Sequence, residues 1–264
     1  MKLFSGVMLA VTIVRYVFSD CVGVSSPVGG NGREGRDQVP WSGSTQKGWV
    51  NNREGRSSSV CGPPCVCVIE SSGATLVDCS MALDPKTVVQ GFASAPPPPP
   101  QVKNSIVRLV VMSSELPALD DDSFGNVSFT HVHVKYNHGL GRVSADALRA
   151  SRSSLKVLDL KNNNLTTFTQ VSLKSFQELQ FLSVDDNAIS VVPDRVSGLA
   201  SLVHLSASNN RLSSLEPLAF TSMPNLQFLD LHSNNLTSIP DQLALLPALR
   251  SLVLWGNPIT TIPQ

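Results

Sequence analysis

The chain has 264 residues, 42% of them apolar, and its 20 basic side chains balance its 20 acidic ones. A chain of this length can form one or two domains with a buried core. Because the net charge is zero and no basic block is present, the composition argues against a nucleic acid or an anionic membrane surface as the main partner.

The first 19 residues have the pattern of a signal peptide. Lys2 supplies a short positive segment, residues 3–18 are mostly apolar, and small or modest residues precede Asp20. Arg15 interrupts the apolar stretch, which is also shorter than the roughly 20 apolar residues of a membrane anchor. We therefore expect cleavage near Asp20, a secreted extracellular protein, and no membrane span.

Residues 20–60 are rich in Gly, Ser, Asn and Arg and have almost no apolar periodicity. Such a composition cannot bury enough apolar surface to offset the entropy of ordering, and it predicts a disordered tether. Cys21 lies at the start of this segment, and we expect it to be unpaired or to join two chains.

Residues 61–95 contain a cluster of four cysteines: Cys61, Cys65, Cys67 and Cys79. In an exported chain this spacing favours disulfides on a small hairpin. A zinc site usually requires two Cys-x2-Cys hooks or added histidines, and no histidine lies in this stretch. Three pairings of the cysteines are possible, and spacing does not decide between them. Residues 96–105, which include the prolines 96–100, follow as a stiff spacer in polyproline II conformation.

From Ile106 to the end one pattern repeats, L-xx-L-x-L-xx-N-x-L. Five clear copies carry their asparagines at intervals of 24, 23, 24 and 23 residues, at Asn163, Asn187, Asn210, Asn234 and Asn257, and two weaker copies begin at Ile106 and Phe129. The alternating apolar residues predict one short parallel strand per copy, and each asparagine amide is expected to satisfy backbone groups in the following turn. Residues 106–264 thus predict a leucine-rich-repeat solenoid of seven units, the last incomplete. Its curved parallel sheet forms the concave face, and its convex face is irregular or short-helical.

The repeats and the four-cysteine segment together resemble the extracellular leucine-rich-repeat family with a cysteine-rich N-terminal cap, over residues 61–264. In that family the cap closes the edge of the first repeat, and the resemblance implies the pairs Cys61–Cys67 and Cys65–Cys79. Residues 106–109, 119–124 and 132–134 look like arthropod proteins called the non-catalytic subunit of oplophorus-luciferin 2-monooxygenase. The chain stops at Gln264 without a C-terminal cysteine cap, so we expect missing sequence or a partner at that edge.

Three side chains of each repeat are expected on the concave sheet, in three rows along the solenoid. Large apolar side chains on this exposed face are not needed for folding, and the binding energy of interfaces is concentrated in aromatic residues surrounded by polar groups. We predict that the binding residues are Phe181, Asp185, His204, Phe228, Asp230, His232 and Trp255. The alternative is that Phe181 and Phe228 merely pack on their neighbours and cover the sheet.

Two groups of polar side chains on this face resemble catalytic or metal-binding sites in their composition. His131 and His133 alternate on one strand with Asp159 on the next, a composition that suits a metal or acid–base catalysis. We expect an ordinary polar binding face instead, because a flat sheet has no pocket to desolvate these groups. Ser206 and His204 lack the geometry and the orienting third group of a hydrolase.

The sequence also contains three N-glycosylation sequons, at Asn126, Asn164 and Asn235. Glycans on Asn164 and Asn235, one place beyond a repeat asparagine, are expected to leave the concave sheet open. These observations predict a secreted recognition protein that is not an enzyme, has no metal or cofactor, and binds a protein or glycan. The alternative, implied by the arthropod resemblance, is a non-catalytic stabilising subunit of an extracellular monooxygenase complex, with a catalytic oxidoreductase subunit as its partner.

Overall fold

The computed structural model describes residues 65–69, 75–80, 107–112, 116–121, 123–144, 146–167, 173, 176–192, 199–216, 219–220, 223–239 and 241–261. The chain divides into two units, residues 1–57 and 58–264, and everything described belongs to the second unit. The expected signal peptide, the expected tether, the spacer 96–105 and most of the cysteine-rich segment lie outside the described residues.

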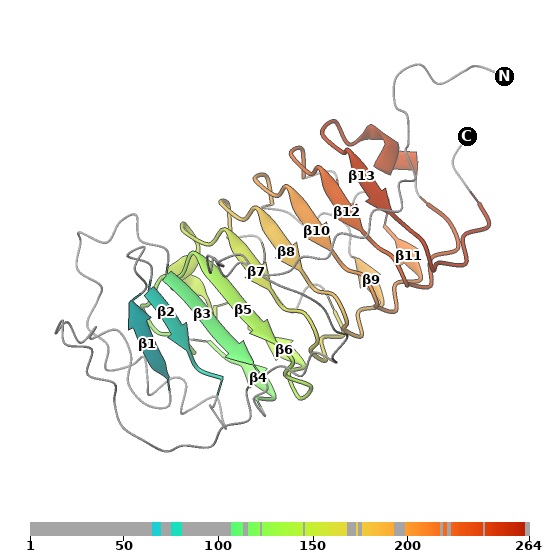
Figure 1. Cartoon of the computed structure of the whole chain (residues 1–264). Helices are drawn as coiled ribbons and strands as arrows, with labels where there is room; N and C mark the ends of the chain where they lie inside the picture. Colours follow the sequence, from blue (N-terminus) through green and yellow to red (C-terminus); the bar gives the residue numbers. More distant parts are fainter. Residues whose placement is uncertain are drawn as a thin grey trace, which may run out of the picture. The chain divides into compact units, whose positions relative to one another are not determined.

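One sheet organises the second unit. Its nine strands follow the order β1-β2-β3-β5-β7-β8-β10-β12-β13 (Figure 1). They are β1 (Val66–Ile69), β2 (Thr75–Asp78), β3 (Val107–Met112), β5 (His131–Lys135), β7 (Val157–Asp159), β8 (Phe181–Ser183), β10 (His204–Ser206), β12 (Phe228–Asp230) and β13 (Ser251–Val253). From β2 onward every neighbouring pair in this sheet is parallel. Each of the seven predicted repeats contributes one strand, in the order β3, β5, β7, β8, β10, β12 and β13. The expected leucine-rich-repeat solenoid is confirmed.

Alternation along each strand divides the sheet into a buried and an accessible face. In β7, Leu158 is fully buried, whereas Val157 and Asp159 on either side are half-buried. The same central position is occupied by Val132, Leu182, Leu205 and Leu229, each at most 1% exposed. Since successive side chains of a strand point to opposite faces, these residues form a continuous apolar core beneath the sheet.

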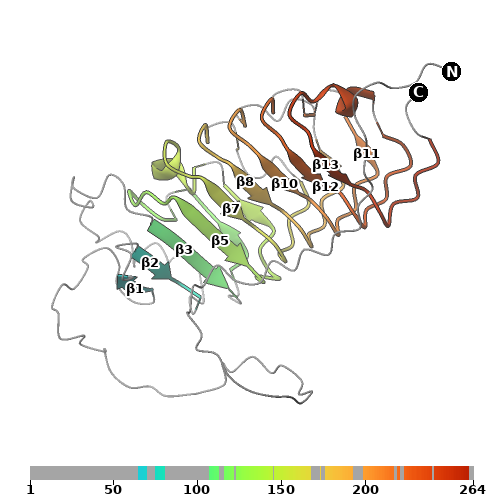
Figure 2. The ribbon, with the colours of Figure 1, turned by 45° about the horizontal axis from the view of Figure 1, so that its top comes forward.

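The return segments opposite the sheet are mostly irregular, as expected, and among the described residues they include the short 3₁₀ helices η2 (Arg149–Ser151) and η5 (Asp241–Leu245). The structure adds two small parallel sheets that the sequence analysis did not predict (Figure 1; β11 is labelled in Figure 2 as well). One pairs β4 (Ala118–Leu119) with β6 (Arg142–Val143), and the other pairs β9 (Val191–Val192) with β11 (Ser214–Leu215). Strands of two residues are too short to produce a periodic pattern. In the part of the chain that is described, no helix is long and apolar enough to cross a membrane.

The repeat asparagines form a ladder along one edge of the sheet. Asn187 is typical: its Nδ2 donates to the carbonyls of Leu160 and Val184 at 2.9 and 3.0 Å, and its Oδ1 accepts from the amide of Leu165 at 3.0 Å. Asn163, Asn210, Asn234 and Asn257 repeat the donor contacts one repeat apart. The predicted role of these amides in the turn is therefore confirmed.

The residue before each ladder asparagine adopts a left-handed backbone conformation, which the sequence analysis missed. The same holds before Asn137, the equivalent asparagine of the second repeat, whose Nδ2 donates to the carbonyls of Val111 and Lys135. The φ angles are 50–58° at Tyr136, Asn162, Asp186, Asn209 and Ser233, and 73° at Gly256. Asn, Asp and Gly tolerate this conformation best, and half of these six positions carry Asn or Asp. A Cβ on Gly256 would also lie 3.0 Å from Ser233 Oγ and 3.2 Å from Ser233 Cα. This turn lets each chain segment leave the sheet just before its ladder asparagine.

At the first edge of the solenoid, the antiparallel hairpin β1–β2 lies against β3. A disulfide joins Cys65 and Cys79, both of which are buried, and the amide of Cys79 donates to the carbonyl of Val110 at 2.8 Å. This is one of the two pairs that the family resemblance implies. Cys61 and the side chain of Cys67 lie outside the described part of the chain.

Candidate binding face of the sheet

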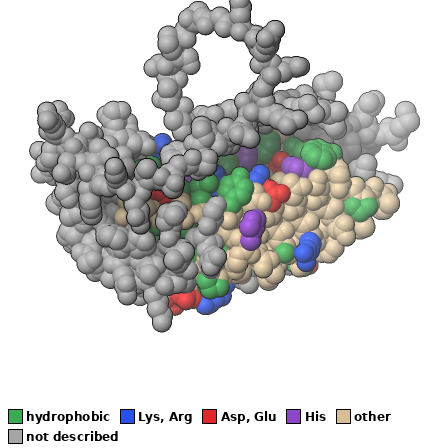
Figure 3. All heavy atoms as spheres, turned by 60° about the horizontal axis from the view of Figure 1, so that its bottom comes forward, with side chains coloured by type: hydrophobic (Ala, Val, Ile, Leu, Met, Phe, Trp, Pro, Cys, Tyr) green, Lys and Arg blue, Asp and Glu red, His purple; other side chains and the backbone are tan. Residues whose placement is uncertain are grey.

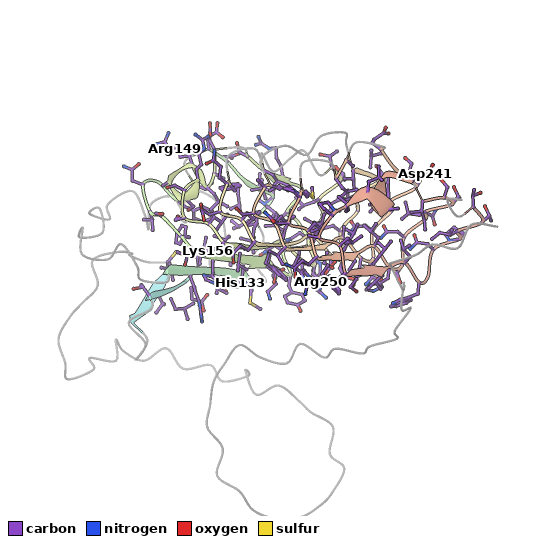
Figure 4. The ribbon with its side chains drawn as sticks, turned by 90° about the horizontal axis from the view of Figure 1, so that it is seen from above. His133, Arg149, Lys156, Asp241 and Arg250 are labelled. Carbon is purple, nitrogen blue, oxygen red and sulfur yellow. A yellow bond between two sulfur atoms is a disulfide. The ribbon has the colours of Figure 1, made fainter. Side chains whose placement is uncertain are left out.

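The accessible face of the sheet carries three rows of side chains, which together we call the open face; it corresponds to the concave face of the sequence analysis. The first row is Arg108, His131, Val157, Phe181, His204, Phe228 and Ser251, and the central row is Val110, His133, Asp159, Ser183, Ser206, Asp230 and Val253. The third row is Met112, Lys135, Lys161, Asp185, Ser208, His232 and Trp255. His133 and Arg250 lie near the sheet, whereas Arg149 and Asp241 lie on the opposite side (Figure 4).

Three rings in the first row stack on one another and form what we call the aromatic stack. The His204 ring lies between Phe181, at a centroid distance of 4.7 Å and an angle of 18°, and Phe228, at 4.3 Å and 9°. All three side chains are half-buried. Burial lowers the pKa of His204, and the charges of Asp185 and Asp230, which favour protonation, do not overcome it. His204 therefore offers a neutral ring at neutral pH.

A second stacked pair lies in the third row. The rings of His232 and Trp255 have centroids 4.2 Å apart and planes 17° apart. His232 Nδ1 lies 2.7 Å from Asp230 Oδ1, which also accepts the backbone amide of His232 at 3.0 Å. Asp230 therefore holds the imidazole in place, while Trp255 is 65% exposed. An exposed indole on a rigid support is well suited to contact a partner.

Asp185 is surrounded by hydrogen-bond donors from its own and the next repeat. Its Oδ1 accepts from the hydroxyl and the amide of Ser208, both at 2.8 Å, and from Ser206 Oγ at 2.5 Å. Its Oδ2 accepts from Ser183 Oγ at 3.0 Å. The Ser206 hydroxyl is thus directed at a carboxylate, and the His204 ring is held between two phenyl rings, which is not a nucleophile–base arrangement.

Around β5 and β7 the open face is cationic. Lys135 Nζ lies 3.1 Å from Asp159 Oδ2, and the buried His133 Nδ1 lies 3.5 Å from the same oxygen, too far for a good hydrogen bond. Burial alone would raise the pKa of Asp159, but the contact with His133 and the charge of Lys135 outweigh it and lower that pKa. In the described part of the chain, no group of three His, Cys, Asp or Glu side chains is arranged to hold a metal ion.

Six of the seven predicted site residues therefore fall into two neighbouring groups, and Asp185 contacts the three serines instead. The structure brings together Phe181, His204 and Phe228, and separately Asp230, His232 and Trp255. On the face shown in Figure 3, hydrophobic, histidine and acidic side chains lie close together. Their role in binding stays a prediction. The sequence analysis did not single out Lys135, Lys156, Ser183 or Ser208, although Ser183 stands at the repeat position equivalent to Ser206.

The three sequon asparagines, Asn126, Asn164 and Asn235, are all exposed. The amides of Asn164 and Asn235 donate to the carbonyls of Leu140 and Leu212, at 2.9 and 2.8 Å, in equivalent turns. Both residues are thus exposed in the turns that follow a ladder asparagine and lie outside the three rows of the open face, which is compatible with the predicted glycosylation.

Leucine-rich-repeat family models match residues 128–189, 153–212 and 200–259, together about half of the chain. The chain therefore belongs to the leucine-rich-repeat family. Over 142 residues it is 25% identical to the oplophorus-luciferin 2-monooxygenase non-catalytic subunit of Oplophorus gracilirostris. The matched region is 53% of this chain and 38% of that protein, so the chain spans well under half of its relative.

Proposed function

We propose that this chain is a secreted recognition protein that binds a macromolecular partner, a protein or a glycan, through its open face, without catalysing a reaction. The observation that carries the proposal is the aromatic stack of Phe181, His204 and Phe228, next to the exposed Trp255. These rings lie on the side of the sheet away from the core, so the folded chain gains little from their apolar character.

The energetics support a binding role for these rings. An aromatic side chain that is covered by a partner contributes about 1.5–3 kcal/mol from its buried area, and such residues dominate the energy of most interfaces. The supporting geometry is rigid, since Asp230 fixes His232 beneath Trp255. A rigid aromatic surface loses little conformational entropy when it binds, which favours affinity.

The extracellular location is part of the same proposal. The signal-peptide pattern of residues 1–19 and the sequons at Asn126, Asn164 and Asn235 support it. The disulfide between Cys65 and Cys79 is also typical of oxidising compartments outside the cytosol.

A second candidate function is that of a stabilising subunit in an oxidative enzyme complex. The observation that favours it is the similarity to a non-catalytic subunit, at 25% identity over 142 residues. In this case the partner on the open face is a catalytic oxidoreductase subunit. Purification from the native secretion distinguishes the two functions: a stoichiometric catalytic partner supports the subunit, and its absence supports free recognition.

The test of the open face is a comparison of two double variants. Phe181→Ala with Phe228→Ala removes both outer rings of the aromatic stack. We expect this variant, when immobilised, to capture the native partner from the extracellular fluid of the source organism at least tenfold more weakly, equivalent to about 1.4 kcal/mol. Captured proteins and glycans are identified by mass spectrometry, and affinity is measured by titration.

The matched control is Asp241→Ala with Leu245→Ala, on η5 on the opposite side of the repeats, where Leu245 is 77% exposed. This control removes an exposed leucine and a carboxylate away from the open face and is expected to leave capture unchanged. Both variants should keep the melting temperature close to that of the parent protein. If the η5 variant loses capture while the phenylalanine variant keeps it, the binding face is assigned wrongly.

A further inference from the structure

Charge is unevenly distributed along the open face. At the strands β3, β5 and β7, what we call the cationic half carries Arg108, Lys135 and Lys161 in the three rows, with His131 and His133 between them. It also includes Lys156, which lies outside the rows, directly before β7, and whose charge acts on His131. Asp159 is the carboxylate within it, and it is engaged with Lys135. From β8 to β13, what we call the aromatic half carries Phe181, His204, Phe228, His232 and Trp255 together with Asp185, Asp186 and Asp230.

His131 lies among the positive charges of the cationic half, which act on its pKa. The pKa of His131 is lowered, first by burial and then by the charges of Arg108, His133 and Lys156. Lys156, just before β7, is exposed, so its charge faces solvent and is available to a partner. One strand beyond the cationic half, Asp78 on β2 is engaged by the amide of Ser80 at 2.9 Å.

The carboxylates of the aromatic half are already occupied by contacts within the chain. Asp185 accepts four hydrogen bonds from Ser183, Ser206 and Ser208, and Asp230 holds His232. Asp186 pairs with Lys161 at 3.2 Å, at the border between the halves. What this half offers to a partner is therefore ring surface, in a setting of negative charge that repels anions.

We propose that the open face binds an extended protein segment that carries acidic residues at one end and apolar residues at the other, with the acidic end over the cationic half. This inference rests on the proposed function and specifies its partner. From Arg108 to Phe228 the first row crosses five strand intervals of about 4.8 Å, or roughly 24 Å. An extended segment of about seven or eight residues covers this distance, at roughly 3.3 Å per residue.

The arrangement favours such a segment over an anionic polysaccharide. A sulfated glycan carries negative charge along its whole length, so it would gain energy over the cationic half and lose it beside Asp185, Asp186 and Asp230. A protein segment can change from acidic to apolar within a few residues. Its acidic end would speed association, and its apolar end would supply most of the residence time through the rings.

The test uses a fluorescent peptide of about ten residues, with glutamates at one end, leucine and tryptophan at the other, and a short flexible spacer between them. Fluorescence anisotropy measures its binding to the full-length secreted protein at about 50 mM and about 200 mM salt. A peptide of the same composition with acidic and apolar residues alternating, an all-glutamate peptide and a heparin oligosaccharide are the comparison probes. We expect the block peptide to bind at least tenfold more tightly than the other three, and more weakly at the higher salt concentration.

Charge reversal tests the orientation of the segment. Arg108→Glu with Lys156→Glu should weaken block-peptide binding at least tenfold and flatten its salt dependence. The matched control, Arg149→Glu with Arg211→Glu, changes the net charge equally at exposed positions outside the cationic half and should change the affinity less than twofold. If the double variant melts early, Lys156→Glu alone, at an exposed side chain, provides the test, with a threefold or larger loss expected.

Three outcomes would overturn the inference: no saturable binding of the block peptide, equal binding of the alternating peptide, or an unchanged affinity after charge reversal. Tighter heparin binding that the charge reversal removes would identify an anionic glycan as the ligand and would also reject the protein segment. The proposed function is judged separately by the phenylalanine variant. Loss of native capture in that variant, with no effect of charge reversal, would leave the function intact and reject this partner.

Discussion

A ladder asparagine shows how one side chain joins neighbouring repeats. Asn187 donates to carbonyls of its own and the preceding repeat, and it accepts a hydrogen bond from an amide of the preceding repeat. A hydrophobic residue of similar size could fill the same space but would leave these backbone groups without partners. A buried polar group without a hydrogen-bond partner lowers the free energy of unfolding by about 1–3 kcal/mol. We therefore expect that Asn187 stabilises the turn through its hydrogen bonds and not through its shape.

The replacement Asn187→Leu should lower the free energy of unfolding by more than about 1 kcal/mol. Urea unfolding monitored by circular dichroism measures the change. Asn164→Leu, at an exposed asparagine in the preceding turn, is the control and should have an effect within about 0.5 kcal/mol when both proteins are made without glycans. Equal effects of the two replacements would contradict the role given to the ladder.

His204 provides a prediction on pH. Its folded pKa lies below the ordinary value of 6.5 because the flanking rings bury it. A depressed folded pKa means that the unfolded chain binds the proton first as the pH falls. The contribution of this residue to stability is therefore complete above pH 6.5 and is lost as the pH falls below it, towards the folded pKa.

Removal of the flanking rings should reverse this effect. In Phe181→Ala with Phe228→Ala we expect the pKa of His204 to rise towards 6.5, since the ring gains water on both sides. A titration of the imidazole signals by NMR measures the value in the parent protein and in the variant. An unchanged pKa would mean that burial by the two rings is not the cause of the shift.

At the scale of the strand, the sequence predicts a great deal because the pattern of period two is explicit. The strands of the large sheet that come from the repeats, which are β3, β5, β7, β8, β10, β12 and β13, and the neighbours in all three rows follow from the repeat. The left-handed conformation before the ladder was missed even though most of these positions carry Asn, Asp, Gly or Ser, because the repeat pattern does not fix their residue type and Tyr136 at the equivalent position does not look like a turn residue. The short sheets β4–β6 and β9–β11 were missed because two residues carry no period.

The candidate site was less predictable than the strands that support it. Sequence places Phe181, His204 and Phe228 in one row, but their stacking depends on side-chain rotamers, which no sequence pattern specifies. The engagement of Asp185 by Ser183, Ser206 and Ser208 depends on distances of a few tenths of an ångström across two strands. Residue type and row could therefore be derived, whereas the availability of each group to a partner could not.

For the molecule as a whole, the stability of a solenoid depends on neighbours on both sides of each repeat. Leu205 and Leu252 occupy the same position of different strands, yet Leu205 is 1% exposed and Leu252 is only partly buried. We expect Leu205→Ala to lower the free energy of unfolding by about 3 kcal/mol and Leu252→Ala by about 1 kcal/mol. Leu205 is packed on all sides, so its replacement removes more packing contacts and leaves a larger cavity.

Urea unfolding measures both values, and amide hydrogen exchange shows where each protein opens. Exchange in the Leu205→Ala protein should increase on both sides of β10, whereas in the Leu252→Ala protein it should increase mainly around β13. If the two leucine replacements destabilise equally, the repeats do not act as a chain of coupled neighbours.

The strict register of the repeat strands means that small and large insertions have different consequences for this protein. An insertion of one residue within a strand would exchange the core and the open face for every later position of that strand. The gain of a whole repeat, 23 or 24 residues long, would instead add one strand and extend the open face by about 4.8 Å, with the alternation intact. Duplication of repeats thus offers a route by which such a protein can adapt to a longer partner while each existing repeat keeps its packing.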